Sequence, residues 1–263
     1  MKKNIFVLGL FLTFISCNKV PISNRKQFNL LPESEMMSMS FSSYKDFISK
    51  HQVVSQGDAQ LVKNVGYKIS KAVEQYFQQK NQSKLLNGYS WEFNLVNDNS
   101  VNAWCMPGGK VVFYTGILPV TQNETGIAVV MGHEIAHAIA RHGNERMSQQ
   151  LLVQAGGVAL SAALTQKSKE TQDVFLTSYG VGSNLGILKY SRTHESEADK
   201  LGLVFMAIAG YNPAEAISFW QRMAKQSTGN KPPQLLSTHP SDETRIKDIQ
   251  SFLPVALKYY KSN

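Results

Sequence analysis

The chain has 263 residues, 43% of them hydrophobic, which is enough for a folded protein with a sizeable core. Its formal net charge is +8, but Lys and Arg are scattered, without a dense basic block or interleaved aromatic residues. The charge pattern therefore argues against nucleic acid as a partner. It indicates at most an affinity for anionic membrane surfaces or acidic partners.

The first residues predict an export signal. Lys2 and Lys3 are basic, residues 5–15 are almost wholly apolar, and Ser16 with Cys17 closes the segment. The apolar run is short for a membrane span but has the length of a signal-peptide core. A small residue before cysteine resembles a bacterial lipobox, which implies cleavage before Cys17 and a lipid on that cysteine. The alternative is a soluble secreted protein.

Three regions are expected from this start. Residues 1–17 form a lipoprotein signal peptide that ends at the lipobox cysteine, residues 18–31 form a polar tether, and residues 32–263 form a single domain. If Cys17 carries lipid, Cys105 is the one cysteine left and no internal disulfide forms. The expected location is the bacterial cell envelope, facing the periplasm, with a lipid anchor in the outer membrane rather than the inner.

Helices and strands then alternate along the domain. Apolar residues at helical spacing predict helices from Pro32 onward and over residues 58–79. Residues 91–95 alternate as a half-buried strand, and residues 101–105 and 110–114 predict two more strands around a Pro-Gly-Gly turn. Together the strands predict a small antiparallel sheet.

A helix over residues 123–143 contains the motif His-Glu-x-x-His, formed by His133, Glu134 and His137. Residues i and i+4 share one helix face, so both imidazoles can point at a single ion. Asn123 is expected to cap the start of this helix. Buried polar groups without partners cost roughly 1–3 kcal/mol each, which a bound metal would offset. The alternative is a chance match, with the histidines in a core or on a surface.

A third ligand is expected downstream, because a catalytic zinc usually has three protein ligands and one position for water. Residues 190–199 carry Glu195, Glu197 and Asp199 at the start of an apolar helix. Glu195 and Asp199 share a helix face, so one can bind the metal while the other orients a histidine. Glu197 has no assigned role and is expected on a solvated or salt-bridged face.

These motifs resemble those of the gluzincin peptidases of metallopeptidase family forty-eight. The family includes the CAAX prenyl endopeptidases, the heat-shock protease HtpX, the mitochondrial Oma-type protease and periplasmic lipoprotein proteases of bacteria. Besides the His-Glu-x-x-His helix, the motifs that match are Ser191-Arg192-x-x-Glu195-x-Glu-Ala-Asp199, Asn102-Ala103 with Pro107-Gly108-Gly109, Ala209-Gly210-Tyr211-Asn212-Pro213, Thr238-His239-Pro240 with Arg245, and the tether segment from Pro21 to Gln27.

The resemblance implies a mostly helical α+β fold with a zincin-like catalytic unit. That unit consists of the His-Glu-x-x-His helix, a small antiparallel sheet and a downstream glutamate helix. One Zn²⁺ per chain would be bound by His133, His137 and Glu195. Asp199 would orient one of the metal-binding histidines, and Glu134 would be the general base.

Further site residues follow from the same resemblance. His239 is expected near the metal, where it either holds the site shut or helps to stabilise the oxyanion; the alternative is an ordinary loop histidine. Arg245 is expected to face the same pocket and contact substrate, with a surface salt bridge as its alternative. The strand edge at Asn102, Ala103 and Trp104 is expected to hold the substrate backbone by β-augmentation, unless it is an ordinary hairpin.

The expected function is therefore that of a zinc metalloendopeptidase that degrades misfolded envelope proteins in quality control. The alternative is a latched or inactive homologue that binds client proteins as a chaperone or assembly factor. Natural substrate, cleavage specificity and oligomeric state stay open. Residues 147–189 stay open too, because the apolar run from Leu151 to Leu164 predicts either a core helix or a mobile, membrane-contacting lid with hinges at Gly180, Gly182 and Gly186.

Overall fold

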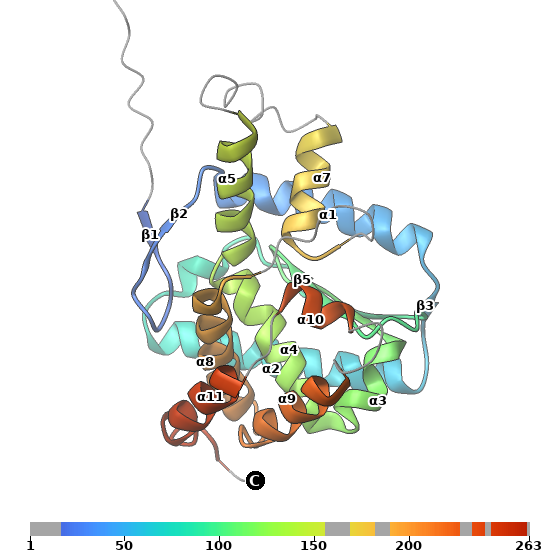
Figure 1. Ribbon diagram of the computed structural model, residues 1–263, viewed down its shortest axis with the longest axis vertical. Coiled ribbons are helices and arrows are strands. Elements are labelled where there is room, and N and C mark those ends of the chain that lie inside the picture. The colour runs from blue at the N-terminus through green and yellow to red at the C-terminus, as the bar shows by residue number, and fades with distance from the viewer. Residues whose placement is uncertain (1–16, 156–168, 182–189, 227–232, 240–242, 262–263) are drawn as a thin grey trace, which may run out of the picture.

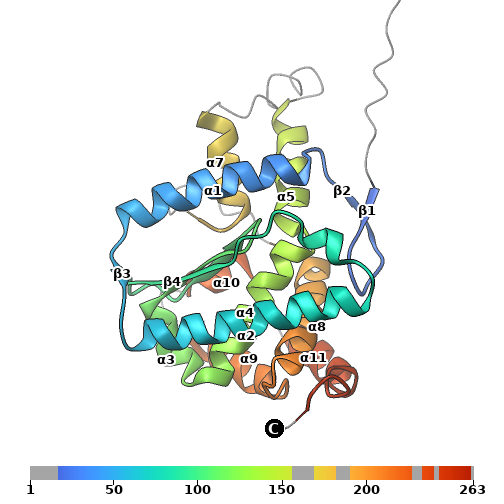
Figure 2. The ribbon, with the colours of Figure 1, turned by 180° about the vertical axis from the view of Figure 1, so that it is seen from behind.

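The computed structural model describes residues 17–155, 169–181, 190–226, 233–239 and 243–261. A small sheet lies in the middle of the molecule, and helices cover both of its faces (Figure 1 and Figure 2). The strand order is β3-β4-β6-β5, formed by Val53–Val54, Glu92–Val96, Lys110–Tyr114 and Ala103–Met106.

The sheet is mixed, whereas an antiparallel sheet was expected. β5 and β6 form the expected antiparallel hairpin, with Cys105 opposite Val111. β4 instead pairs with β6 in parallel, with Leu95 opposite Phe113. β6 therefore lies between β4 and β5, because the chain after β4 passes to the far side of the sheet before the hairpin forms. Local alternation predicts each strand but carries no information about its partner.

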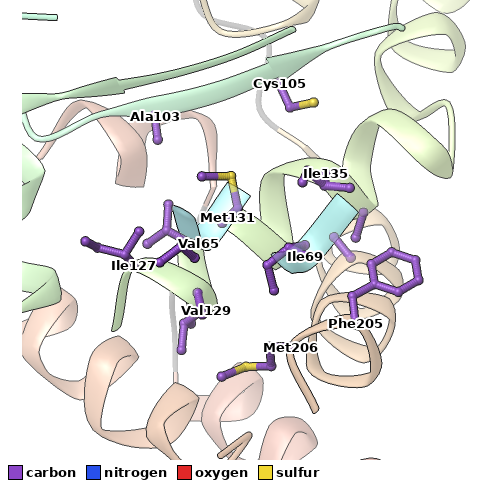
Figure 3. Packing of buried hydrophobic residues seen from close by; sticks show 14 of the residues in the cluster. Val65, Ile69, Ala103, Cys105, Ile127, Val129, Met131, Ile135, Phe205 and Met206 are labelled. Carbon is purple, nitrogen blue, oxygen red and sulfur yellow. The ribbon is translucent and has the colours of Figure 1, made fainter. Parts of the chain in front are cut away.

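Alternate residues of the strands enter two different core clusters. On β5, Ala103 and Cys105 pack into the cluster beneath one face, and Trp104 and Met106 pack into the cluster on the other. Figure 3 shows Ala103 and Cys105 above Met131 on the side of the first cluster. Both faces of the sheet are buried, so the sheet serves as a rigid platform between helices.

The helices that cover the sheet belong to the same two clusters. One cluster includes side chains of α2 and α4, and the other includes side chains of α1, α5 and α7. The expected helix over residues 58–79 is confirmed. The helices of the described residues are α1 (Glu33–Lys50), α2 (Asp58–Gln79), α3 (Leu118–Thr121), α4 (Glu124–Ile139), α5 (His142–Ala155), α7 (Lys169–Ser178), α8 (Arg192–Ile208), α9 (Glu215–Gln226), α10 (Gln234–Thr238) and α11 (Glu243–Ala256). Short 3-10 turns occur at Ser83–Leu86 and Thr115–Ile117.

The helix expected over residues 123–143 is shorter than predicted. Its start is confirmed, since Asn123 Oδ1 accepts a hydrogen bond of 2.9 Å from the amide of Gly126. It ends at Ile139, because Arg141 takes the left-handed conformation with φ of 57° and turns the chain. His142 then begins α5, so this residue is held just beyond the helix that carries the His-Glu-x-x-His motif.

Two glycines bring α4 and α8 together. Gly132 of α4 faces Gly202 of α8, and a Cβ added to Gly132 would lie 2.9 Å from the carbonyl oxygen of Gly202. Only glycine permits such a close backbone approach without displacing one helix. The contact holds α8 beside α4 (Figure 1). The start of α8 carries Glu195, and α4 carries His133 and His137.

The segment expected as an irregular tether is an ordered hairpin. β1 (Cys17–Lys19) and β2 (Lys26–Phe28) pair in antiparallel fashion, and Val20 between them is fully buried. The polar residues that predicted a loop lie in its turn, where Asn24 has φ of 55°. The hairpin lies beside α5 and α8 in both views (Figure 1 and Figure 2).

Some expectations fall outside the described residues. These are the signal segment up to residue 16, most of the run after Ala155, and the proposed hinges at Gly182 and Gly186. Gly180 is described and has φ of 72°. Among the helices that the structure describes, none combines the length and the apolar character that crossing a membrane requires.

Candidate metal centre

Four buried side chains converge on one point from three parts of the chain. His133 and His137 come from α4, Glu195 from the first turn of α8, and His239 directly follows α10. One donor atom from each lies within 4.8 Å of all the others. The Nε2 atoms of His133 and His137 are 3.1 Å apart, and His239 Nδ1 lies 3.0 Å from Glu195 Oε1.

The outer nitrogen of each α4 histidine is held by a neighbour. His133 Nδ1 lies 2.9 Å from Asp199 Oδ1, so this nitrogen donates to the carboxylate and Nε2 is left with its lone pair. His137 Nδ1 lies 2.9 Å from Nδ1 of His142. Both rings thus turn Nε2 toward the centre of the cluster, which is the orientation that a metal ligand needs.

The buried guanidinium of Arg245 organises the acidic side of the cluster. Its Nε and Nη2 donate to Asp199 at 2.7 and 2.8 Å, and Nη1 lies 2.7 Å from Glu195 Oε2. Its carbon Cζ sits 3.4 Å from the ring centre of Trp220. Arg245 was expected to contact substrate, but the structure places its guanidinium on two carboxylates of the site itself.

The donor set fits a divalent cation. The site contains the carboxylates of Glu134, Glu195 and Asp199 against one guanidinium, so a doubly charged ion would balance the formal charge. The Nε2 atoms of His133 and His137 face each other at hydrogen-bonding distance, although neither has a proton to spare when both rings are neutral and donate through Nδ1. A cation between them removes that conflict.

Burial and the neighbouring charges shift the pKa of the site residues in different directions. Burial raises the pKa of Glu134. Burial also acts to raise the pKa of Glu195, but the charges of Arg245 and His239 outweigh it and hold the pKa well below its usual range. Burial and Arg245 lower the pKa of His133, yet hydrogen bonds to Asp199 and Glu195 outweigh both and raise it to about 9. Burial holds the pKa of His137 well below its usual range, so of the two rings His133 alone gains a proton without metal, and a bound cation would take that proton's place.

Glu134 lies beside the four donors without joining them. Its carboxylate is buried, and Oε1 lies 3.6 Å from His239 Nε2. That Oε1 atom accepts no hydrogen bond from any residue that the structure describes. A buried carboxylate without a donor at one oxygen is suited to accept a proton from a water molecule.

The expected substrate edge lies at the end of the sheet. β5 is the last strand in the order, so its outer backbone edge is paired with no other strand of the described chain. Asn102, just before β5, is buried, and its Nδ2 donates to no described residue. The indole of Trp104 instead packs edge-on against Phe47 on the opposite face and donates to the hydroxyl of Tyr114 at 3.1 Å. At the edge of β5, Trp104 can therefore offer a substrate only its backbone N–H and C=O groups.

A second polar cluster, which sequence reasoning missed, lies behind His137. Glu197 is salt-bridged, which was one of its two expected settings, but it is buried, with His142 and Arg25 both 3.0 Å away. His194 contacts Glu145 at 3.0 Å and is not one of the four donors. The one signal in the sequence was the match of the segment from Pro21 to Gln27 to a family motif. It gave no indication of what that segment contacts.

Comparison with known proteins supports the peptidase interpretation. Residues 67–253 match the family model described as Peptidase family M48. The chain is 34% identical over 246 residues to the mitochondrial metalloendopeptidase OMA1 of Schizosaccharomyces pombe, which covers 92% of this chain and 68% of that protein. Against OMA1 of Saccharomyces cerevisiae it is 32% identical over 259 residues, covering 94% and 72%. The beta-barrel assembly-enhancing protease of Yersinia pestis is 33% identical over 165 residues, covering 61% of this chain and 34% of that protein.

These relatives correct one expectation. A location in the bacterial cell envelope was predicted from the first 17 residues, but the relatives that match over most of the chain are mitochondrial. The bacterial relative matches a smaller part. The prediction was wrong because it rested on a short segment that says nothing about the domain behind it.

Proposed function

Because the chain belongs to peptidase family M48, as its family match and its relatives show, we propose that it is a zinc-dependent endopeptidase that removes misfolded proteins. The family implies polypeptide substrates. One observation carries the proposal: the buried carboxylate of Glu134 lies next to four convergent metal-binding donors. One relative is named a beta-barrel assembly-enhancing protease, and we propose by analogy that proteins which fail to assemble are substrates of this chain.

We propose His133, His137 and Glu195 as the zinc ligands. Imidazole nitrogen and carboxylate oxygen are the donors that catalytic zinc commonly takes. A zinc ion bound there would polarise a water molecule and the scissile carbonyl. Asp199 holds the ring of His133 by its Nδ1, and Arg245 holds both Asp199 and Glu195, so these two residues position ligands.

Glu134 is the proposed general base. It accepts one proton from the attacking water as the water oxygen bonds to the carbonyl carbon. When the carbon–nitrogen bond breaks, Glu134 returns that proton to the leaving amine. Its burial and its raised pKa suit a carboxyl group that must carry the proton between the two steps.

The substrate backbone is proposed to pair with the outer edge of β5. Pairing there extends the sheet by one strand and brings a peptide alongside α4, which packs against β5. The buried Nδ2 of Asn102 has no partner in the described chain and is suited to donate to a substrate carbonyl. Ala103 and Trp104 contribute backbone groups.

His239 is proposed to hold the site shut. Its Nδ1 lies 3.2 Å from His133 Nε2 and 3.0 Å from Glu195 Oε1, so it takes the fourth donor position that a catalytic water would need. Opening the site requires the side chain of His239 to withdraw from these two contacts.

A chaperone without peptidase activity is not favoured, since the family and the named relatives are peptidases. We also propose that residues 1–17 are a targeting signal and that Cys17 carries lipid, which would tie the enzyme to a membrane surface. The mass of the mature N-terminal peptide, with and without substitution of Cys17 by Ser, tests that assignment.

Digestion of casein tests the peptidase assignment. The wild-type protein is expected to cleave casein, to lose activity with a chelator and to regain it with zinc. Glu134→Gln is expected to keep bound zinc but to lose about 100- to 10,000-fold in rate. Glu124→Gln is the matched control, because Glu124 lies at the start of the same helix and contacts Lys68 rather than the site.

Full activity of Glu134→Gln would exclude Glu134 as the base. Zinc-loaded wild type that cleaves neither casein nor unfolded peptides would overturn the proposed function. A cleavage profile by mass spectrometry on a denatured proteome would then define the sequence preference of an active enzyme.

A further inference from the structure

His142 lies directly behind the proposed ligand His137 and is completely buried. Its Nδ1 is 2.9 Å from Nδ1 of His137, and its Nε2 is 3.0 Å from Oε2 of Glu197. The carboxylate cannot donate, so the proton of His142 belongs on Nε2 and points at Glu197. His142 Nδ1 is then an acceptor, and His137 must donate to it through its own Nδ1.

This arrangement determines which nitrogen of His137 faces the metal position. With its proton on Nδ1, the ring presents the Nε2 lone pair to the other donors. Asp199 performs the same task for His133 directly. For His137 the carboxylate is one residue further away, because His142 stands between the ligand and Glu197.

Glu197 is in turn held by the hairpin of β1 and β2. Arg25 donates from Nε to Glu197 Oε1 at 3.0 Å and from Nη2 to Oε2 at 3.0 Å. Ser23 donates its hydroxyl to the same carboxylate. Glu197 therefore accepts from His142 on one side and from the hairpin on the other, and this fixes the carboxylate between them.

Arg25 also joins α5, which begins at His142, to α8. Its Nη1 and Nη2 each donate to Glu145 of α5 at 2.8 Å, while Glu197 lies on α8. Glu145 binds His194, whose ring stacks on His142 with centroids 4.6 Å apart. Without Arg25, two buried carboxylates would face each other with no cation between them.

Gln27 connects the hairpin to the turn after α4. Its Nε2 donates to the carbonyl of Ala140, which lies between His137 and His142, and also to Glu145. The hairpin thus holds both the backbone that positions His142 and the carboxylate that His142 binds. The contact of Gln27 with Ala140 and the contact of Arg25 with Glu197 both restrict the ring of His142, the first through the backbone and the second through the carboxylate.

We propose that the β1–β2 hairpin is a positioning strap for the metal centre, in which Arg25 acts through Glu197 and His142 to fix the ring of His137. This inference rests on the proposed function, because it takes His137 as a metal ligand. The proposal means that residues of the hairpin, more than a hundred positions before the His-Glu-x-x-His motif, help to determine the affinity for the metal. Arg25, Glu197 and His142 touch no reacting atom and are positioning residues.

The test compares Arg25→Gln with Lys26→Gln in the full chain. Both variants remove one positive charge from the hairpin, but Lys26 is exposed and its side chain takes no part in the cluster. Zinc affinity is measured by competition with a chromogenic chelator, and ligand geometry by the visible spectrum of the cobalt-substituted protein. Arg25→Gln is expected to bind zinc about 10- to 100-fold more weakly and to change the cobalt spectrum. Lys26→Gln is expected to match wild type.

A double-mutant cycle tests whether Arg25 acts on zinc binding through His142. His142→Gln alone should weaken zinc binding, and adding Arg25→Gln should weaken it little further, because the connection is already broken. If the loss of zinc affinity in the double variant equals the product of the two single losses, Arg25 does not act through His142 and the proposal is overturned. It is also overturned if Arg25→Gln lowers thermal stability while zinc affinity and cobalt spectrum stay those of wild type.

A conservative variant keeps the test decisive if Arg25→Gln fails to fold. Arg25→Lys retains the charge but cannot bind both carboxylates through paired N–H groups, so an intermediate zinc affinity is expected. Wild-type affinity in Arg25→Lys would count against the strap. Wild-type protein that binds no metal would overturn both proposals, whereas metal binding without peptide cleavage would overturn the proposed function alone.

Discussion

Gly132 and Gly202 meet backbone to backbone where α4 crosses α8. A Cβ added to Gly202 would lie 2.9 Å from the carbonyl carbon of Gly132 and 2.9 Å from the amide nitrogen of His133. Neither atom can move without moving its helix. The distance between Glu195 and the α4 histidines therefore depends on two residues that have no side chain.

Gly202→Ala is accordingly expected to force α8 away from α4. Overpacking of this kind costs about 1–3 kcal/mol in the free energy of unfolding. It should also weaken zinc binding, because Glu195 moves with α8. Urea unfolding in chelator and zinc competition measure the two effects, with the exposed Thr193→Ala on the same helix as the control. Wild-type zinc affinity in Gly202→Ala would show that the crossing does not set the site.

His239→Ala is expected to weaken zinc binding and to raise the rate on a short peptide several-fold. The variant loses the donor that lies 3.2 Å from His133 Nε2, so the fourth position becomes available to water. Zinc-saturated kinetics on a fluorogenic peptide measure the rate. A lower rate at full zinc occupancy would instead assign His239 to the oxyanion and not to a latch.

Glu145→Gln is expected to lower stability at neutral pH but not in acid. Burial acts to raise the pKa of Glu145, but hydrogen bonds from Arg25 and His194 outweigh it and lower the pKa from its ordinary value of 4.5 to about 2. Since the folded pKa is depressed, the ionised group stabilises the fold above about pH 4.5, and this contribution is lost as the pH falls toward 2.

The measurement is the difference in unfolding free energy between wild type and Glu145→Gln, in chelator, at pH 7, 4 and 3. The difference should shrink steadily over that series. Substitution of the exposed Glu243 by Gln controls for the loss of a carboxylate as such. A difference that stays constant from pH 7 to pH 3 would contradict the assigned ion pairs.

Zinc is expected to stabilise the folded chain strongly. At a free concentration one hundred times its dissociation constant, a ligand that binds only the folded state adds about 2.7 kcal/mol. The formal negative charge of Glu134, Glu195 and Asp199 should make the metal-free protein the less stable form. Thermal unfolding with zinc and with chelator measures the effect. His137→Ala should abolish most of the difference, and an equal difference in that variant would place the ion elsewhere.

Much of the site was readable from local spacing. His133 and His137 are four residues apart, and so are Glu195 and Asp199, and helix geometry alone puts each pair on one face. The cap at Asn123 and the hairpin of β5 and β6 are also local and were confirmed. Such features need only neighbouring residues, so a single sequence contains them.

Other features required the packed molecule. Residues 18–31 were predicted to form a polar tether, yet Arg25 binds carboxylates 120 and 172 positions away. Arg245 and Glu197 were recognised as motif members, but no local rule could say that the first binds Asp199 or that the second binds His142. Parallel pairing of β4 with β6 was missed for the same reason.

The sequence by itself determined the chemistry of this protein: which donors are present, at which helical spacing, and next to which carboxylate. Only the tertiary structure decided how the donors meet and what holds them. The reason is physical, since helical and strand periodicity are properties of contiguous residues, whereas the partner of a buried charge is whatever the packed chain places beside it.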